Sequence, residues 1–264
     1  MCEVKEIKIK NFYTHNEYHI GDNLWHLNFM RRLAQKYQNY KFFHAAKEIY
    51  HTQLNEVISD ISNLFLINLD SRPLNSLNVW LNYNNFHDHH PNKFEISLCL
   101  IDHFNNISKK LNLECPVVNT SDLLFDYPEI KRVNFPKFDF LIINSMPESN
   151  QFKEVPSDFD KLIAQLISKK YSIITTEQSS FPCPCTRNLG YSITDIGAIS
   201  LSCKFIIGVP NGPMWPTFNK WNINSVKFRI LTISNGDKVN FCSNTYHVES
   251  IDESINLLRS FELL

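Results

Sequence analysis

No excess of charge of either sign marks this sequence. Its 26 basic and 27 acidic side chains give a formal net charge of −1 over 264 residues. Proteins whose main partner is nucleic acid concentrate Lys and Arg against the phosphate backbone, so this balance argues against that class. Hydrophobic residues make up 43% of the chain and charged residues 20%, the proportions of a globular protein that buries a sizeable core.

Long apolar runs are missing as well. The opening MCEVKEIKIK alternates charged and apolar residues and lacks the continuous apolar segment of a signal peptide. No stretch approaches the ~18 apolar residues that a membrane-spanning helix needs. The seven cysteines are scattered and odd in number, which fits a reducing compartment better than a disulfide framework. We therefore expect a cytoplasmic protein without a transmembrane segment; peripheral membrane contact and the oligomeric state stay open.

Helix and strand signals alternate along the chain. In the first half we expect helices at residues 20–37, 47–57 and 94–111, strands at residues 41–46 and 64–69, and a loop over residues 70–93. In the second half we expect strands at residues 138–145, 171–178, 204–209 and 226–234, and helices at residues 157–170, 192–203, 213–221 and 253–261. Asp22 or Asn23 is the expected N-cap of the first helix.

This order predicts an α/β protein with two Rossmann-like parallel-sheet lobes that face a central cleft. We place the lobes at residues 1–118 and 119–264, with the last helix packing back on the first lobe. In open parallel sheets, ligands bind beyond the carboxyl ends of the strands, where strand-to-helix loops converge. Candidate site residues are therefore sought at strand ends and helix starts.

The first candidate is HIGDN (19–23), at the start of the first expected helix. If a strand precedes it, Gly21 permits a sharp turn and Asp22 faces the cleft. A carboxylate in this position can act as a general base toward a hydroxyl group within hydrogen-bond reach. The alternative is that Gly21 and Asp22 form only a turn and a helix cap, a frequent use of Asp.

The second candidate is GVPNGPMWPTF (208–218), which follows a buried strand and opens a short helix. Free N–H groups at a helix start bind anions, and Gly212 allows a phosphate to come close to the backbone. Pro213 suits the first helical turn, and Asn211 offers a hydrogen bond to a sugar or ribose hydroxyl. An ordinary Asn-Gly-Pro turn is the competing interpretation. A Walker loop is excluded, because no Gly-Lys-Ser/Thr sequence occurs.

Two further segments carry polar or metal-binding residue types. In TTEQSSFPCPCTRNLGYSITDIG (175–197), we assign Gln178, Thr186 and Arg187 to the donor side; Arg187 is suited to bidentate pairing with a diphosphate, or holds the surface loop. Cys183 and Cys185 are too closely spaced for a usual zinc pair. In FHDHHP (86–91), the side chains suggest a metal site formed by His87, Asp88, His89 and His90. The alternative interpretation is a substrate-binding loop.

Two of these segments resemble a known family. HIGDNLWHLNFMRRLA (19–34) and SITDIGAISLSCKFIIGVPNGPMWPTF (192–218) are similar to segments of the glycosyltransferases that include the bacterial heptosyltransferases, glycosyltransferase family 9. The resemblance implies the two-domain GT-B fold, with an acceptor-side first lobe and a nucleotide-sugar-binding second lobe. It implies that Gly21 and Asp22 supply the base that activates the acceptor hydroxyl. It also implies that a turn and helix hold the donor diphosphate, at Asn211, Gly212, Pro213 and Met214.

The sequence departs from this family in two respects. It is shorter than a typical member, so one lobe must be trimmed. Trp215 stands where the family usually has His, and Pro210 stands where an acidic residue is usual; an altered donor or lost activity would explain both. Relatives of unassigned function also begin with a His-x-Gly-Asp segment, which adds His19 to the candidate catalytic residues, and Asn23 joins the donor-binding set.

The leading hypothesis is a metal-independent glycosyltransferase of the hexosyl or heptosyl type, with no cofactor beyond its nucleotide-sugar substrate. It would act on a hydroxyl acceptor of the glycan, lipopolysaccharide or capsule type. A non-catalytic nucleotide- or glycan-binding protein of the same fold is the second hypothesis. A metal-dependent hydrolase centred on residues 87–90 is the third.

Overall fold

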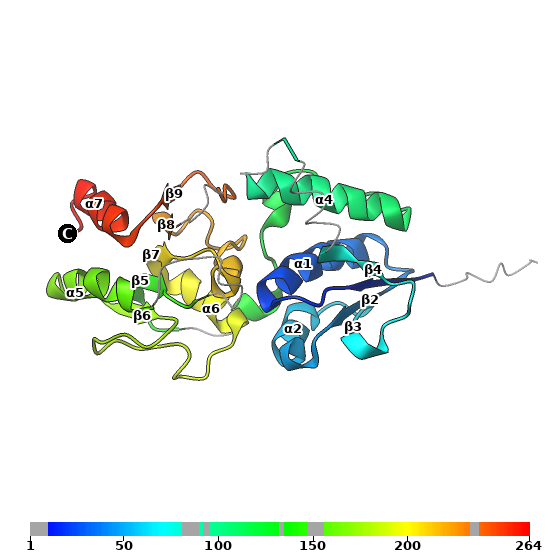
Figure 1. Ribbon diagram of the computed structural model, residues 1–264, viewed down its shortest axis with the longest axis horizontal. Helices are drawn as coiled ribbons and strands as arrows, with labels where there is room; N and C mark the ends of the chain where they lie inside the picture. Colours follow the sequence, from blue (N-terminus) through cyan, green and yellow to red (C-terminus); the bar gives the residue numbers. More distant parts are fainter. Residues whose placement is uncertain (1–9, 81–89, 92–94, 132–134, 147–155, 233–237) are drawn as a thin grey trace, which may run out of the picture.

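A computed structural model describes residues 10–264, except residues 81–89, 92–94, 132–134, 147–155 and 233–237. Two sheets form the framework, and every strand pair in both sheets is parallel. Figure 1 shows the two lobes side by side, with helices flanking each sheet. The predicted α/β architecture of two Rossmann-like lobes is confirmed. No helix among the described residues is long and apolar enough to cross a membrane.

The first sheet has the strand order β3-β2-β1-β4. Its strands are β1 (Asn11–His15), β2 (Lys41–Ala46), β3 (Leu64–Asn68) and β4 (Leu77–Asn78). The helices of this lobe are α1 (Ile20–Lys36), α2 (His51–Ile58) and α4 (Ile96–Leu111), and the 3-10 turns η1 (Glu48–Tyr50) and η2 (Leu69–Ser71) precede α2 and β4. The 3-10 turns η3 (Thr120–Leu123) and η4 (Pro128–Lys131) lie in the connection to the second sheet.

The second sheet has the strand order β6-β5-β7-β8-β9. Its strands are β5 (Phe138–Ile143), β6 (Ile173–Thr175), β7 (Cys203–Gly208), β8 (Phe228–Thr232) and β9 (Thr245–Val248). The helices are α5 (Asp160–Ser168), α6 (Ile193–Ile199) and α7 (Ile251–Ser260), together with the 3-10 helices η5 (Pro156–Phe159), η6 (Ser200–Ser202) and η7 (Gly212–Thr217).

Each sheet contains a point at which the strand order reverses. In the first sheet the chain moves outward from β1 to β3 and then crosses to β4 on the other side of β1. In the second sheet it moves from β5 to β6 and then crosses to β7. The loops at such a point leave in opposite directions and open a crevice for a ligand. The loops after β1 and after β7 contain the two candidate motifs.

Apolar packing joins the two lobes. One cluster of buried side chains extends from Leu27 and Phe42 in the first lobe to Ile143 and Met214 in the second. Each of these side chains is excluded from water, and burying one contributes roughly 1.5–3 kcal/mol. The lobes therefore share a continuous apolar core.

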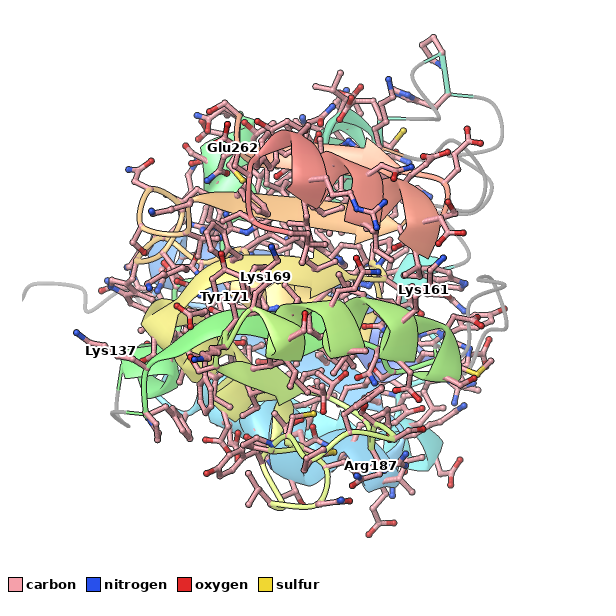
Figure 2. All side chains as sticks on the ribbon, turned by 90° about the vertical axis from the view of Figure 1, so that its left-hand side faces the viewer. Lys137, Lys161, Lys169, Tyr171, Arg187 and Glu262 are labelled. Atoms are coloured by element: carbon pink, nitrogen blue, oxygen red, sulfur yellow. The ribbon has the colours of Figure 1, made fainter. Side chains whose placement is uncertain are left out.

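A second cluster lies on the outer face of the second sheet. There α5 and α7 cover inward-facing strand residues such as Phe140 and Ile207. Figure 2 looks onto this face, with α7 and α5 in front of the sheet. An ion pair between Lys161 and Asp252 joins the two helices. The last helix thus packs on the second lobe, and the expectation that it returns to the first lobe is wrong.

Several local predictions also need correction. His19, not Asp22 or Asn23, is the N-cap of α1, which makes Asp22 the third residue of the helix. The expected helix at residues 213–221 is the six-residue 3-10 helix η7, because Pro216 lies inside it and removes a backbone donor. Strands β4 and β9 were not expected; β4 has two residues and lies in the segment predicted as a loop.

Candidate functional site

The first turn of α1 presents Asp22 beside the end of the first sheet. Strand β1 ends at His15, and the chain enters the helix through His19, whose backbone is extended (φ −84°, ψ 165°). The His19 N–H donates to Asp22 Oδ2 at 3.3 Å. This hydrogen bond from the capping residue back to the third helical residue fixes the carboxylate at the start of the helix. Strand β1 meets the condition set for the general-base interpretation, but Gly21 and Asp22 lie in the first turn of α1 and not in a turn that precedes it.

Burial raises the pKa of Asp22 to about 6, because desolvation disfavours the charged carboxylate. The His19 backbone hydrogen bond and the charge of the His19 side chain act in the opposite direction and offset part of this rise. A carboxylate with a pKa near neutrality is a stronger base than an ordinary Asp and is still largely ionised at pH 7. Asp22 therefore has the protonation properties of a general base.

The loop after β7 carries Asn211, whose side chain is buried. Its Nδ2 donates to the backbone carbonyl of Ser145 at 2.5 Å and lies 3.1 Å from Ser145 Oγ. Because Ser145 follows β5, these bonds cross the point of strand reversal in the second sheet. Asn211 Oδ1 is buried and has no hydrogen-bond partner among the described residues. This oxygen can accept a hydrogen bond from a ligand hydroxyl.

The structure brings the two sequence motifs into direct contact. A Cβ added to Gly21 would lie 3.1 Å from Trp215 Nε1 and 3.2 Å from Gly212 Cα. A Cβ added to Gly212 would lie 3.3 Å from the Ile20 side chain. The rings of Trp25 and Trp215 extend the contact, with centroids 5.3 Å apart. Glycine at both positions thus lets the backbone of the α1 start approach the backbone that follows β7.

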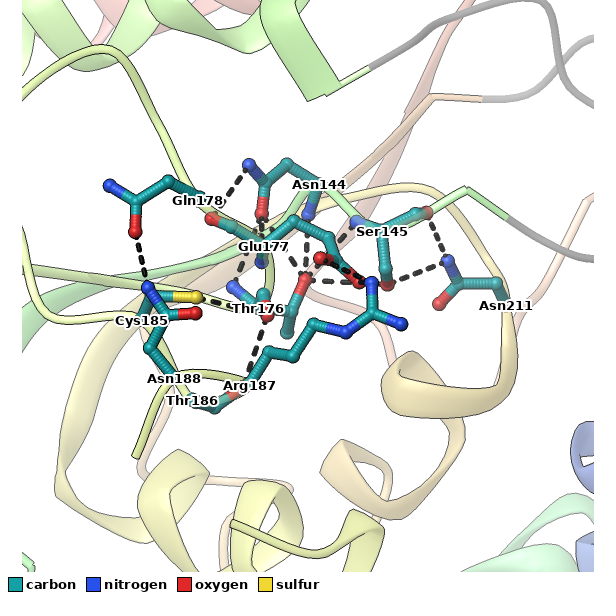
Figure 3. A network of polar contacts seen from close by, with 10 residues as sticks. All are labelled: Asn144, Ser145, Thr176, Glu177, Gln178, Cys185, Thr186, Arg187, Asn188 and Asn211. Carbon is teal, nitrogen blue, oxygen red and sulfur yellow. Dashed lines mark hydrogen bonds and ion pairs between the residues drawn. The ribbon is translucent and has the colours of Figure 1, made fainter. Parts of the chain in front are cut away.

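A polar network joins the carboxyl ends of β5 and β6 (Figure 3). Thr176 Oγ1 accepts from the N–H groups of Asn144 at 3.0 Å and Ser145 at 3.1 Å. Asn144 Oδ1 accepts in turn from the N–H groups of Thr176 at 3.2 Å and Glu177 at 2.9 Å. The network holds the ends of both strands in a fixed position at the reversal point. Thr176 and Glu177 belong to the candidate segment 175–197 without an assigned role, whereas Asn144 and Ser145, which follow the apolar strand β5, were not among the candidates.

The residues predicted to bind the nucleotide-sugar donor are partly exposed and partly buried. Arg187 is 73% exposed, and its guanidinium lies 2.8 Å from Glu177 Oε2. The positive charge that was predicted to bind a diphosphate is therefore already paired with a carboxylate. Arg187 projects from the loop after β6 in Figure 2. Gln178 is exposed and accepts a hydrogen bond from Asn188. These residues lie at the edge of the Figure 3 network.

Three other predicted donor residues have buried side chains. Thr186 is buried, and its N–H donates to the Thr175 carbonyl at 2.8 Å. Asn23 is fully buried and donates to the His19 carbonyl at 2.9 Å. Met214 packs in the apolar core, and its N–H donates to the Asn211 carbonyl at 2.9 Å. These side chains lie in the protein interior, which does not support the expected direct contact with the sugar donor. Pro213 is only partly buried, at the start of η7.

Side chains from the first lobe cover the N-terminus of α6. Ser192 Oγ donates to Glu56 Oε2 at 2.9 Å, and the Ile193 N–H donates to Gln53 Oε1 at 3.2 Å. Thr194 also donates to Glu56. Helix α6 thus starts at an interlobe contact, with Ser192 as its N-cap.

Of the four residues predicted as a metal site, the structure describes His90. His87, Asp88 and His89 lie outside the described residues. His90 is described, and its Nε2 lies 2.9 Å from Asp102 Oδ2 while its Nδ1 lies 3.4 Å from the buried Cys99 thiol. No group of three or more metal-binding side chains occurs within the described part of the chain.

Comparison with known proteins places the fold. No protein-family model matches the sequence, and no curated protein matches it. Several solved structures resemble it, among them the following three. The glycosyl transferase family 9 protein from Veillonella parvula is 13% identical, with a TM-score of 0.53, and the match covers 98% of this chain and 90% of that one.

The second structure is the E. coli heptosyltransferase WaaC with ADP, which is 9% identical with a TM-score of 0.57, over 96% of this chain and 98% of that one. The third is TibC, an iron-containing dodecameric glycosyltransferase from enterotoxigenic E. coli. It is 13% identical with a TM-score of 0.50, over 90% of this chain and 63% of that one. At these identities the likeness establishes a shared fold, and it confirms the resemblance to family 9 at that level.

Proposed function

We propose that this protein transfers a sugar from a nucleotide-activated donor to a hydroxyl group of an acceptor, with Asp22 as the base. The observation that carries the proposal is the contact between Gly21 and Gly212. It places a carboxylate with a pKa of about 6 on the helix turn that packs against the strand-reversal point of the second sheet. A base and a nucleotide-binding edge are the two parts that such a reaction requires.

The donor is proposed to lie at the carboxyl ends of β5, β6 and β7. Asn211 Oδ1 and Glu177 would accept hydrogen bonds from sugar or ribose hydroxyls, and the backbone at Gly212 would approach the diphosphate. Because η7 has only six residues, its helix dipole contributes little, and we assign the binding to these polar groups. The structural likeness to WaaC, which was solved with ADP, makes ADP and ADP-sugars the first ligands to test.

The proposed chemistry is a displacement at the anomeric carbon of the donor sugar. Asp22 accepts the proton of the acceptor hydroxyl group. At the same time the oxygen of that hydroxyl group forms a bond to the anomeric carbon. The bond between the carbon and the diphosphate oxygen breaks, and the nucleoside diphosphate leaves with the electron pair. The Gly212 backbone is the group proposed to stabilise the charge that develops on the leaving group. We propose that the transfer needs no metal; the iron of TibC gives a specific reason to test this point.

Turnover with matched variants tests the proposal. Purified protein is incubated with a panel of nucleotide-sugars and sugar acceptors, and nucleoside diphosphate release is followed with time. Asp22→Asn should abolish turnover and leave the donor dissociation constant within about threefold of wild type, since the carboxylate acts only on the acceptor. Asp122→Asn is the control, because Asp122 has the same capping position in η3, away from the site. An active Asp22→Asn protein would exclude Asp22 as the base.

Trp215 supports a second candidate, a nucleotide- or glycan-binding protein without catalysis. Its indole fills the space beside Gly21 in a position where the related family usually has His. Calorimetry with nucleoside diphosphates separates the two candidates. Binding without release or transfer of sugar, across all acceptors tried, favours the binding protein.

A further inference from the structure

A chain of buried hydrogen bonds runs from the first sheet to the first turn of α1. Thr14 Oγ1 on β1 lies 2.9 Å from His44 Nδ1 on β2, and His44 Nε2 lies 2.9 Å from Asn23 Oδ1 on α1. Asn23 Nδ2 then donates to the His19 carbonyl at 2.9 Å. Thr14, His44 and Asn23 are all almost completely excluded from solvent. The chain ends at the residue that caps α1.

The chemistry of these groups fixes the direction of every bond in the chain. Burial lowers the pKa of His44 to about 3, so the ring is neutral at pH 7 and carries one N–H. The Asn23 side-chain oxygen can only accept, which places that hydrogen on Nε2. His44 Nδ1 therefore accepts, and the Thr14 hydroxyl donates to it. The Asn23 amide is consequently oriented with its NH₂ group toward His19.

This arrangement acts on Asp22 through the backbone of His19. The His19 carbonyl accepts from both the side chain and the backbone N–H of Asn23, at 2.9 and 3.2 Å. The His19 N–H donates to Asp22 Oδ2 at 3.3 Å. The backbone angles of His19 therefore determine both where its N–H points and where Asp22 stands. Loss of the hydrogen bond from Asn23 Nδ2 would leave the His19 carbonyl held by the backbone N–H of residue 23 alone.

We propose that Asn23, oriented by His44, is a positioning residue that fixes the His19 backbone and thereby holds the Asp22 carboxylate in place for proton transfer. The proposal rests on the role of Asp22 as the base. It gives Asn23 a function different from the donor contact expected from sequence, and it explains why a polar amide occupies a fully buried position on α1. A buried amide is tolerated only when its hydrogen bonds are satisfied.

Three buried histidine rings near this turn are neutral, whereas the charge of the His19 side chain itself lowers the pKa of Asp22. His26 Nδ1 lies 2.7 Å from the Asp22 backbone carbonyl, and His26 Nε2 lies 3.3 Å from His103 Nε2 on α4. Burial lowers the pKa of His26 to about 4 and the pKa of His103 well below its usual value. Together with neutral His44, these rings add no charge at pH 7. A change in the Asp22 titration near neutral pH would then report on its contact with His19.

The test measures the chemical shift of the Asp22 carboxyl carbon as a function of pH, by carbon-13 NMR of protein labelled at Asp. The signal that is missing from the Asp22→Asn spectrum identifies Asp22. Removing the Asn23 amide loosens the His19 N–H that favours the charged form. Asn23→Ala should therefore raise the midpoint of the Asp22 titration by about 0.5 to 1. Asn28→Ala is the matched control, because Asn28 is a buried residue of α1 whose amide donates to the Leu123 carbonyl at 2.8 Å. It should destabilise the helix and leave the midpoint unchanged.

A second variant covers the case in which Asn23→Ala does not fold. Thr14→Val keeps the volume of the side chain and removes the hydroxyl that orients His44. It should move the Asp22 midpoint upward, by less than Asn23→Ala. Midpoints equal to wild type in the folded Asn23 or Thr14 variants would overturn the proposal, as would an equal shift in Asn28→Ala.

Kinetics give the second readout. Asn23→Ala should lower kcat about tenfold or more and leave the donor KM nearly unchanged. Because loss of folded protein also lowers the apparent kcat at constant KM, the rate is expressed per folded protein, and Asn28→Ala should keep the wild-type value. Failure of the proposed function and failure of the positioning role give different results. If wild type shows no sugar transfer, the proposed function fails while the NMR titration still tests positioning. If wild type transfers sugar and the Asn23→Ala midpoint is unshifted, only the positioning role is lost.

Discussion

Replacing Asp22 with Asn should make the protein more stable at neutral pH, in addition to removing the proposed base. The pKa of Asp22 rises from 3.8 to about 6 on folding, mainly because the carboxylate loses water. Between these two values the folded state holds a proton that the unfolded state has released, so stability falls as the pH rises through that window. Above pH 6 both states are ionised, and the full cost of burying the charge remains.

The size of the effect follows from the same two values. Each pKa unit corresponds to about 1.4 kcal/mol, so the rise from 3.8 to about 6 costs about 3 kcal/mol at pH 7 and above. An Asn amide carries no charge and still offers an oxygen to the His19 N–H. We therefore expect Asp22→Asn to be more stable than wild type by about 1 to 3 kcal/mol at pH 8, and about equally stable at pH 4.

Urea unfolding at several pH values between 4 and 8 measures this difference. The wild-type free energy of unfolding should decline relative to the variant as the pH rises, and level off above pH 7. Asp122→Asn provides the control for loss of a carboxylate at a capping position. If the difference between Asp22→Asn and wild type is independent of pH, or if the variant is the less stable protein at pH 8, the assignment of a desolvated, charged Asp22 is wrong.

Three further predictions concern the contact between the lobes, the exposed cation and metals. Gly21→Ala should lower stability by about 1–2 kcal/mol and weaken nucleotide binding, because the new methyl group would lie 3.1–3.3 Å from Trp215 and Gly212; an unchanged thermal midpoint would contradict the close contact. Arg187→Ala should leave the thermal midpoint within about 2 °C and weaken nucleotide binding by no more than about tenfold, since Arg187 is exposed and paired with Glu177; a complete loss of binding would show that it is the principal diphosphate ligand. Sugar transfer should survive treatment with EDTA, and activity restored only by added metal would refute the metal-free chemistry.

The longest periodic segments were predictable from sequence. Helix α1 and strands β2, β5 and β7 lie within two residues of their expected bounds, because their apolar residues repeat with a clear helical or extended period. Strand β4 was missed, since two residues form no pattern and their pairing with β1 depends on tertiary structure. The N-cap of α1 was misplaced for a related reason: Asp22 has the composition of a cap, and the extended backbone occurs at His19.

The candidate site was predictable in part. The sequence marks Gly21, Asp22 and Gly212 as unusual, but their mutual contact depends on how the two lobes pack. Whether a side chain is buried also depends on tertiary packing and cannot be predicted from its position in the sequence. Asn23 is polar and adjacent to Asp22, so sequence alone suggests a ligand contact, whereas folding places its amide between His44 and the His19 carbonyl. Spacing along a chain does not show which side of a helix turn faces the solvent.

A crystal structure of the protein soaked with nucleoside diphosphates, ADP first, tests the central claim most directly. We expect the nucleotide at the carboxyl ends of β5, β6 and β7, with a hydroxyl donating to Asn211 Oδ1 and the diphosphate beside Gly212, where the first turn of α1 makes contact. A nucleotide bound elsewhere, or an unoccupied second sheet at millimolar ligand, would contradict the assignment of this contact between the lobes as a sugar-transfer site.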